Sequence, residues 1–208
     1  MPQSSPRRIG VYGGGFDPVH NGHLRLARTA RDVLPLDQVV FMPSGGQAHY
    51  KQESNIAGGD QRVEMLRLAI DDEPGLAVSA YEVEQGRFCY TYETLCHLRD
   101  HLPAGSEVVL LTGGDWKDKL HTWKYSEELL REFTVALFSR PGYEHETHLQ
   151  PESPRRRIIY VDMTPIEASS SDIRRRIREG RPYAHLVPPA VKQYIEANQL
   201  YQAENRPA

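Results

Sequence analysis

The chain has 208 residues, of which 39% are hydrophobic and 25% are charged, and its formal net charge at pH 7 is −3. This composition is typical of a globular protein with one sizeable core, and it excludes the disordered and fibrous classes. A net charge so close to zero gives no overall nucleic-acid footprint. We therefore expect no nucleic acid as a partner. Because no apolar run approaches the length of a membrane span, we expect no membrane as a partner either.

The cysteines and one basic segment add to this picture. Cys89 and Cys96 are the only cysteines, and their spacing matches no zinc motif, so a reducing cytoplasm is the simplest environment. The N-terminus has no signal-peptide pattern. Between residues 151 and 181 the sequence holds eight arginines against five acidic residues. Such a basic stretch could serve a polyphosphate.

Apolar runs alternate with segments of helical spacing, which predicts βαβ units and a parallel sheet. In chain order, the expected strands cover residues 8–12, 38–42, 76–80, 107–112, 133–139 and 157–161. The expected helices cover residues 22–33, 60–70, 91–102, 171–179 and 189–198. We therefore expect a single open α/β domain over residues 1–208. Its body is a dinucleotide-binding, Rossmann-like fold over about 8–165, completed by a small helical part over about 166–201.

The segment between the second strand and the second helix differs from an ordinary connection. Residues 43–59 are too many and too polar for a simple link, so we expect a lid that closes over a substrate. The helix after it is expected to begin with Asp60 as its N-cap. In the helix before it, the inner face is expected to end at Val33 or Leu34.

A glycine-rich string follows the first strand, where residues 11–23 read VYGGGFDPVHNGH. Gly13, Gly14 and Gly15 let the backbone approach a bulky anion closely. The helix start behind them offers free N–H groups and a partial positive charge. His20 and His23, one turn apart, share one side of that start. The string therefore predicts a phosphate site that carries out chemistry, and a plain tight turn is the alternative.

Two later segments carry similar signals. Ser169, Ser170 and Ser171 precede an amphipathic helix, so their hydroxyls are expected at its N-terminus, where they can donate to an anion. Arg174 lies in the first turn and could reach a β- or γ-phosphate, whereas a plain capped helix is the alternative. Gly113 and Asp115 follow the apolar strand 107–112 at the edge where open α/β sheets bind ligands, with a tight turn as the alternative.

These segments together resemble a known superfamily. The string G-x-F-D-P-x-H-x-G-H resembles the signature of the H-x-G-H nucleotidyltransferases, and residues 169–174 (SSSDIR) are similar to their second motif, I-S-S-T-x-I-R. Residues 113–123 resemble the G-A-D-x-x-x-x-L-x-x-W segment of the bacterial nicotinate-nucleotide adenylyltransferases. The resemblance runs in order from about residue 9 to 201. It implies a nucleotidyltransferase fold and adenylyl transfer from ATP to nicotinate mononucleotide, giving deamido-NAD and pyrophosphate in NAD biosynthesis.

The resemblance also implies site residues. Both substrates already present phosphates, so positioning and charge stabilisation carry the reaction and no proton abstraction is needed. His23 would then donate to the α-phosphate region, His20 to the triphosphate, and Trp123 would stack on the pyridine ring. Mg²⁺ would arrive with ATP, since no carboxylate cluster indicates a dedicated metal site. The expected catalytic residues are His20, His23 and Arg174. The expected ATP-binding residues are Gly13, Gly14, Gly15, Phe16, Gly113, Asp115, Ser169, Ser170 and Ser171. The expected acceptor-binding residues are His49, Lys51, Thr91, Trp123 and Arg140.

Two segments depart from the family pattern, and both fall where the acceptor is expected. Residues 42–51 read MPSGGQAHYK in place of M-P-x-x-x-P-P-H-K, and residues 89–95 read CYTYETL in place of S-Y-T-x-D-T-L. The acceptor stays open between nicotinate mononucleotide, nicotinamide mononucleotide and another phosphate monoester. A nucleotide-binding sensor on the same fold is the alternative from another class, although His20, His23 and Arg174 are all present. The sequence leaves the oligomeric state open, and a homo-oligomer is compatible with it.

Overall fold

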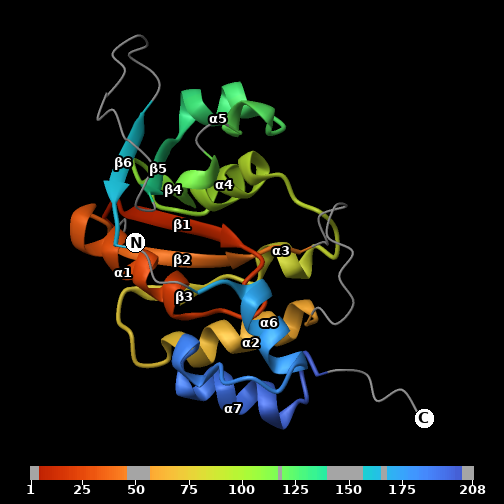
Figure 1. Cartoon of the computed structure of the whole chain (residues 1–208). Coiled ribbons are helices and arrows are strands. Elements are labelled where there is room, and N and C mark those ends of the chain that lie inside the picture. Colours follow the sequence, from red (N-terminus) through yellow and green to blue (C-terminus); the bar gives the residue numbers. More distant parts are fainter. Residues whose placement is uncertain (1–4, 46–56, 117–118, 140–156, 165–167, 203–208) are drawn as a thin grey trace.

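The computed structural model describes residues 5–45, 57–116, 119–139, 157–164 and 168–202. Six strands form one open sheet in the order β3-β2-β1-β4-β5-β6, and every neighbouring pair is parallel (Figure 1). The strands are β1 (Arg8–Gly14), β2 (Gln38–Pro43), β3 (Leu76–Val78), β4 (Glu107–Gly113), β5 (Thr134–Ser139) and β6 (Ile158–Asp162). This order is that of a doubly wound dinucleotide-binding fold, which confirms the predicted class.

Helices cover both faces of the sheet. They are α1 (Asn21–Val33), α2 (Gly59–Ile70), α3 (Tyr81–Glu84), α4 (Thr91–Asp100), α5 (Ser126–Glu132), α6 (Ser170–Arg178) and α7 (Pro189–Ala197). Buried side chains of α1, α2, α6 and α7 share one hydrophobic cluster, and those of α4 and α5 belong to a second cluster. In β4, Val109 faces the first cluster and Val108 the second. A strand buried on both faces explains the continuous apolar run in the sequence.

Some element boundaries and two helices differ from the prediction. The second helix begins at Gly59 with Gly58 as its N-cap, so the prediction of Asp60 as the cap was wrong. The Gln61 side chain accepts a hydrogen bond from the Gly58 N–H at 2.9 Å and performs the capping, while Asp60 sits in the first turn, where a negative charge is favourable. At the end of α1, Val33 is 54% exposed and Leu34 is buried. Helices α3 and α5 were not predicted, because four and seven residues are too short for a clear helical period.

The C-terminal helices pack against the body of the domain. Ile173 of α6 and Val191 and Ile195 of α7 lie in the same hydrophobic cluster as Leu24 of α1 and Leu66 of α2. The predicted boundary near residue 165 lies outside the described residues. Within the described ranges, no helix is both long enough and apolar enough to cross a membrane.

Candidate active site

The glycine string forms the end of β1 and the turn that leads into α1. Gly13 and Gly14 are the last residues of β1 and pair with Met42 and Pro43 of β2. The chain then turns through residues 15–18, which we call the phosphate turn, and α1 starts at Asn21. Because ligands of open α/β sheets bind at the carboxyl ends of the strands, this turn lies at the edge where the sequence predicts the site.

Glycine is explained in different ways at the different positions of the string. A Cβ on Gly14 would meet the ring of Phe16 at 3.0 Å, so packing favours glycine there. A Cβ on Gly13 or Gly15 would meet no described atom within 4 Å. Packing therefore does not explain glycine at those two positions, whereas close approach of a ligand would. Phe16 itself is buried against Tyr12 and adopts a left-handed φ of 48°.

The two histidines lie together at the start of α1, as predicted. His20 is the N-cap residue, and its backbone N–H donates to Nδ1 of His23 at 3.2 Å. The two rings stack with their centroids 3.6 Å apart and their planes at 19°. A Cβ on Gly22 would lie 3.1 Å from the His20 ring, so glycine there leaves room for the stacked pair.

The surroundings of His23 determine its protonation state. Burial, followed by the charge of His20, lowers the pKa of His23 well below its ordinary value, so the ring is neutral at pH 7. Since Nδ1 accepts the His20 N–H, the single ring proton is on Nε2. His23 is thus a neutral hydrogen-bond donor, which suits the stabilisation of phosphate oxygens without proton transfer.

The serine motif contacts the phosphate turn directly. Ser169 caps α6 and accepts the Asp172 N–H at 3.2 Å, as predicted. The Ser170 hydroxyl donates to the Pro18 carbonyl at 2.9 Å. Arg174 donates through one nitrogen to the Asp17 carbonyl at 2.7 Å. Two motifs about 150 residues apart in the sequence are therefore joined in one site.

The arginines of α6 fall into two groups, one buried and one on the surface. Arg174 is buried, and besides the Asp17 carbonyl it faces the Asp17 carboxylate at 3.8 Å and donates to the Ser171 hydroxyl at 3.4 Å. Arg175 and Arg176 instead form ion pairs with Asp172 on the outer side of the helix, and Arg178 is exposed. A contact between Arg174 and a β- or γ-phosphate stays a prediction.

Three further residues of this site were missed by sequence reasoning. The Asp17 carboxylate accepts the Tyr201 hydroxyl at 2.6 Å and the Ala57 N–H at 3.1 Å. Arg62 of α2 donates to the carbonyls of Gly15 and Ser44. Asp17, Arg62 and Tyr201 are all buried. For Arg62 the sequence did hold a signal, since the arginine lies one helical turn before Leu66 and therefore on the inner face of α2.

The end of β4 supplies the second part of the candidate site. Gly113 is the last residue of β4, next to β1 in the sheet, and a Cβ there would meet no described atom. The side chain of Asp115 lies outside the described residues. Beyond it, the rings of Trp116 and Trp123 meet edge to face with centroids 5.0 Å apart. The two tryptophans thus form one wall, in which Trp123 also packs on a core cluster.

The expected acceptor residues are only partly described. Thr91 is the first residue of α4 and is half-buried. His49, Lys51 and Arg140 lie outside the described residues. Both ends of the segment around His49 contact α3: a Cβ on Gly45 would overlap the Glu82 carbonyl, and one on Gly59 would lie 2.5 Å from a methyl carbon of Val83. These contacts give a packing cause for glycine at both positions.

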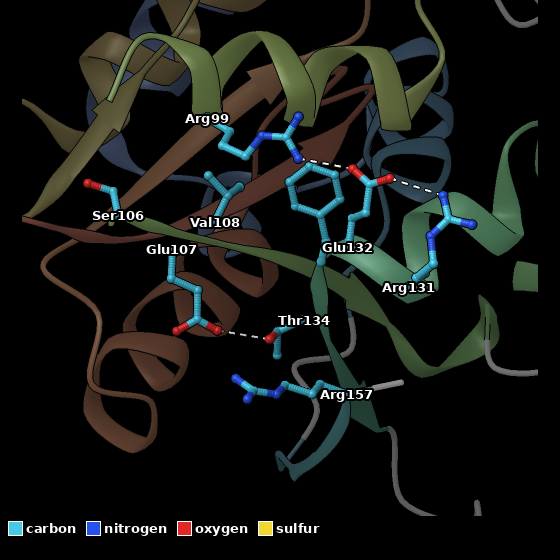
Figure 2. Close-up of a pocket in the computed structure, with 9 residues that line it drawn as sticks. Arg99, Ser106, Glu107, Val108, Arg131, Glu132, Thr134 and Arg157 are labelled. Carbon is cyan, nitrogen blue, oxygen red and sulfur yellow. Dashed lines mark hydrogen bonds and ion pairs between the residues drawn. The ribbon is translucent and has the colours of Figure 1, made fainter. Parts of the chain in front are cut away.

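A cavity of about 320 Å³ lies at the opposite end of the sheet (Figure 2). Its lining includes Glu107 and Thr134, which begin β4 and β5, and Arg157, which precedes β6. Arg99 and Arg131 both donate to Glu132 across it, at 3.0 and 3.2 Å. Because its ionic groups pair largely with each other and none of the motifs reaches it, this cavity is not the candidate site.

The described residues contain no group of three or more histidine, cysteine, aspartate or glutamate side chains that could hold a metal ion. Asp17 is the carboxylate of the H-x-G-H string, and its Oδ1 already accepts two hydrogen bonds.

Comparisons with known proteins find a family model and relatives that match most of this chain. Residues 11–176 match the family model described as cytidylyltransferase-like. A protein of Clostridium botulinum (strain Alaska E43 / Type E3), named probable nicotinate-nucleotide adenylyltransferase, is 36% identical over 203 residues, covering 95% of this chain and 100% of that protein. A protein of Lactiplantibacillus plantarum with the same name is 38% identical over 196 residues, covering 94% of this chain and 89% of that protein.

The solved structures support the fold. Nicotinic acid mononucleotide adenylyltransferase of Plasmodium falciparum, complexed with NaAD, superposes with a TM-score of 0.77 at 16% identity, covering 94% of this chain and 97% of that one. The same protein complexed with APC gives a TM-score of 0.74 at the same identity and coverage. By its sequence, its fold and its two joined motifs, the chain belongs to the cytidylyltransferase-like family and, within it, to the nicotinate-nucleotide adenylyltransferases.

Proposed function

We propose that the protein transfers the adenylyl group of ATP to nicotinate mononucleotide. An oxygen of the acceptor phosphate forms a bond to the α-phosphorus of ATP. The bond from that phosphorus to the oxygen bridging to the β-phosphate breaks, and pyrophosphate leaves with the electron pair. The products are deamido-NAD and pyrophosphate. The observation that carries this proposal is the neutral, donor-ready His23 stacked on His20 at the start of α1.

The histidines act as hydrogen-bond donors in this scheme. Negative charge builds on the α-phosphoryl oxygens and on the leaving group during the transfer. Nε2 of His23 donates to the α-phosphate region and His20 to the triphosphate, next to the N–H groups of the first turn of α1. A neutral donor keeps its proton, so the acceptor phosphate is positioned and not activated by a base.

The rest of the ATP site is formed by the surrounding turns. Gly13, Gly15 and Gly113 leave the backbone open to a nucleotide at the adjacent ends of β1 and β4. Ser171 and Arg174 at the start of α6 face the triphosphate in this proposal. Mg²⁺ enters as part of the Mg-ATP substrate, since magnesium is often held mainly by substrate phosphates and water.

The acceptor is proposed to bind on the side of the two tryptophans. Trp123 offers a flat face for the pyridine ring, Trp116 packs on it edge to face, and Thr91 can donate from the start of α4. His49, Lys51 and Arg140 are assigned to the same mononucleotide. The names of the bacterial relatives favour nicotinate over nicotinamide mononucleotide. The free thiols of Cys89 and Cys96 favour a cytoplasmic location.

The experiment is pyrophosphate release from Mg-ATP with nicotinate mononucleotide and nicotinamide mononucleotide in parallel, with His20→Ala as the control. We expect a strong preference for the nicotinate form and a loss of about 10²–10³ in rate in the variant. Equal rates with both acceptors would correct the acceptor assignment. ATP binding without pyrophosphate release from either acceptor would instead favour a nucleotide sensor.

A further inference from the structure

Arg62 is an unusual residue for its place in the fold. It is the first buried residue of α2, one turn before the buried Leu66, and is 7% exposed. Arginine is almost never fully buried unless its donors are paired, because removing the charge from water is costly. Arg67, five residues later on the same helix, is exposed and pairs with Glu64 on the surface. The two arginines of α2 thus differ in environment and in partners.

The partners of Arg62 are two backbone carbonyls from neighbouring strands. One terminal nitrogen donates to the Gly15 carbonyl at 2.9 Å and the other to the Ser44 carbonyl at 2.7 Å. The parallel pairing of β1 and β2 ends with Gly14 opposite Pro43, so these carbonyls lie immediately beyond the last pair. The guanidinium fork therefore continues the connection between the two strands after their ladder has ended.

This contact fixes the direction of a peptide in the phosphate turn. In a trans peptide the carbonyl and the following N–H point in opposite directions. When Arg62 draws the Gly15 carbonyl toward α2, the N–H of Phe16 is turned to the other side. The carbonyls of Asp17 and Pro18 also accept hydrogen bonds, from Arg174 and Ser170 of α6. A carbonyl oxygen facing a phosphate would repel it, so donors from two helices keep these oxygens engaged.

Two carboxylates balance the buried arginines, because Asp17 attracts both of them and Glu82 of α3 also attracts Arg62. Asp17 attracts Arg62 and Arg174, and it also accepts from Tyr201 and Ala57. Burial raises the pKa of Asp17, although these hydrogen bonds and the two arginines act to lower it. Burial also disfavours the charged form of Arg62 and so lowers its pKa, with Asp17 opposing the shift. In a buried network of this kind a displaced member leaves another without a partner, and Nε of Arg62 itself has no hydrogen-bond partner among the described residues, so its two terminal nitrogens carry its contacts.

We propose that Arg62 is a positioning residue that orients the phosphate turn through the Gly15 carbonyl and couples it to the end of β2, without itself contacting substrate. The inference rests on the proposed adenylyl transfer, because it assigns the orientation of a turn that binds ATP. Its expected effect is on kcat and on the affinity for ATP, since a misplacement of about 1 Å far from the reacting atoms can cost about 100-fold in rate.

The test compares Arg62→Lys, Arg62→Met and, as the matched control on the same helix, Arg67→Lys. Lysine keeps the positive charge beside Asp17 but has one nitrogen, so it cannot hold both carbonyls in a fork. We expect Arg62→Lys to lower kcat about 10- to 100-fold and to raise the KM for ATP, and also to lower the melting temperature because one of the two carbonyls loses its donor. Arg67→Lys should match the wild type in all three.

The competing outcomes are distinct. If Arg62→Lys keeps the wild-type kcat and KM while only the melting temperature falls, Arg62 is structural and the proposal is overturned. If Arg62→Met does not fold, Arg62→Lys alone decides by the same criterion. The dissociation constant of ATP is measured in parallel by calorimetry and needs no turnover. If the wild type binds ATP but uses no pyridine mononucleotide, the proposed function fails, and weaker ATP binding by Arg62→Lys still supports the positioning role.

Discussion

The two ends of the sheet use arginine in opposite ways. At the carboxyl end, Arg62 and Arg174 are buried and donate to backbone carbonyls of the phosphate turn and of the end of β2. At the amino end, Arg99 and Arg131 are partly exposed and donate to the side chain of Glu132 (Figure 2). Side-chain pairs of the second kind can rearrange without moving the backbone. An arginine bound to carbonyls fixes the chain itself, so the first arrangement suits a site where geometry must be held.

The largest predicted effect is on the catalytic rate, after substitution of His23 at the carboxyl end of the sheet. In His23→Asn, the amide oxygen can replace Nδ1 as the acceptor of the His20 N–H, but the Nε2 donor is lost. We expect kcat to fall by about 10²–10³ while the melting temperature changes little. His23→Ala, which removes both functions, is the control and should lose stability as well. A His23→Asn enzyme of normal rate would show that His23 only caps α1.

The next effect concerns the buried carboxylate. Tyr201→Phe removes the hydroxyl that donates to Asp17 at 2.6 Å and leaves part of a buried charge without its partner. We expect the free energy of unfolding to fall by about 1–3 kcal/mol, measured by urea denaturation. Tyr194→Phe on the half-buried side of α7 is the matched control and should stay near the wild-type value. If the urea denaturation curves of the two variants coincide, the hydrogen bond from Tyr201 to Asp17 does not contribute to stability.

The pH dependence of unfolding should report on His23. Its pKa in the folded protein lies well below 6.5, because of burial and the charge of His20. As the pH falls below 6.5, the unfolded chain therefore binds a proton that folded His23 does not, and the folded state loses stability. Relative to His23→Asn, the wild type should lose at most about 1.4 kcal/mol per pH unit in this window. Parallel profiles for the two proteins would contradict a buried neutral imidazole.

The smallest effect is expected at the amino end of the sheet. Hydrogen bonds from Arg99, and also from Arg131 and Tyr92, lower the pKa of Glu132, so the carboxylate is charged at pH 7. Because this cluster is partly open to solvent, Glu132→Gln should cost less than about 1 kcal/mol of unfolding free energy. The catalytic rate should not change. A large loss of activity in Glu132→Gln would mean that the two ends of the molecule are coupled.

The sequence predicted the parts of the fold that repeat a local pattern. The six strands were recognisable because each is a short apolar run, and the sheet followed from their alternation with helices. The resemblance assigned the H-x-G-H string and the serine motif to one ATP site, and the structure joins them through Pro18 and Asp17. Arg62 and Tyr201 were not predicted as site residues, since their partners lie 47 and 184 residues away and only the tertiary structure brings them together. Helix α3 was missed because four residues carry no period.

The hydrogen bond between Tyr201 and Asp17 has a consequence for the order of synthesis. Asp17 is translated early, but the hydroxyl that completes its surroundings arrives 184 residues later. Until then, a growing chain can pair β1 with β2 but must leave the Asp17 carboxylate short of a donor. Closing so long a loop is slow compared with local steps. Adenylyl transfer should therefore appear only late in the maturation of the chain, after α7 has docked.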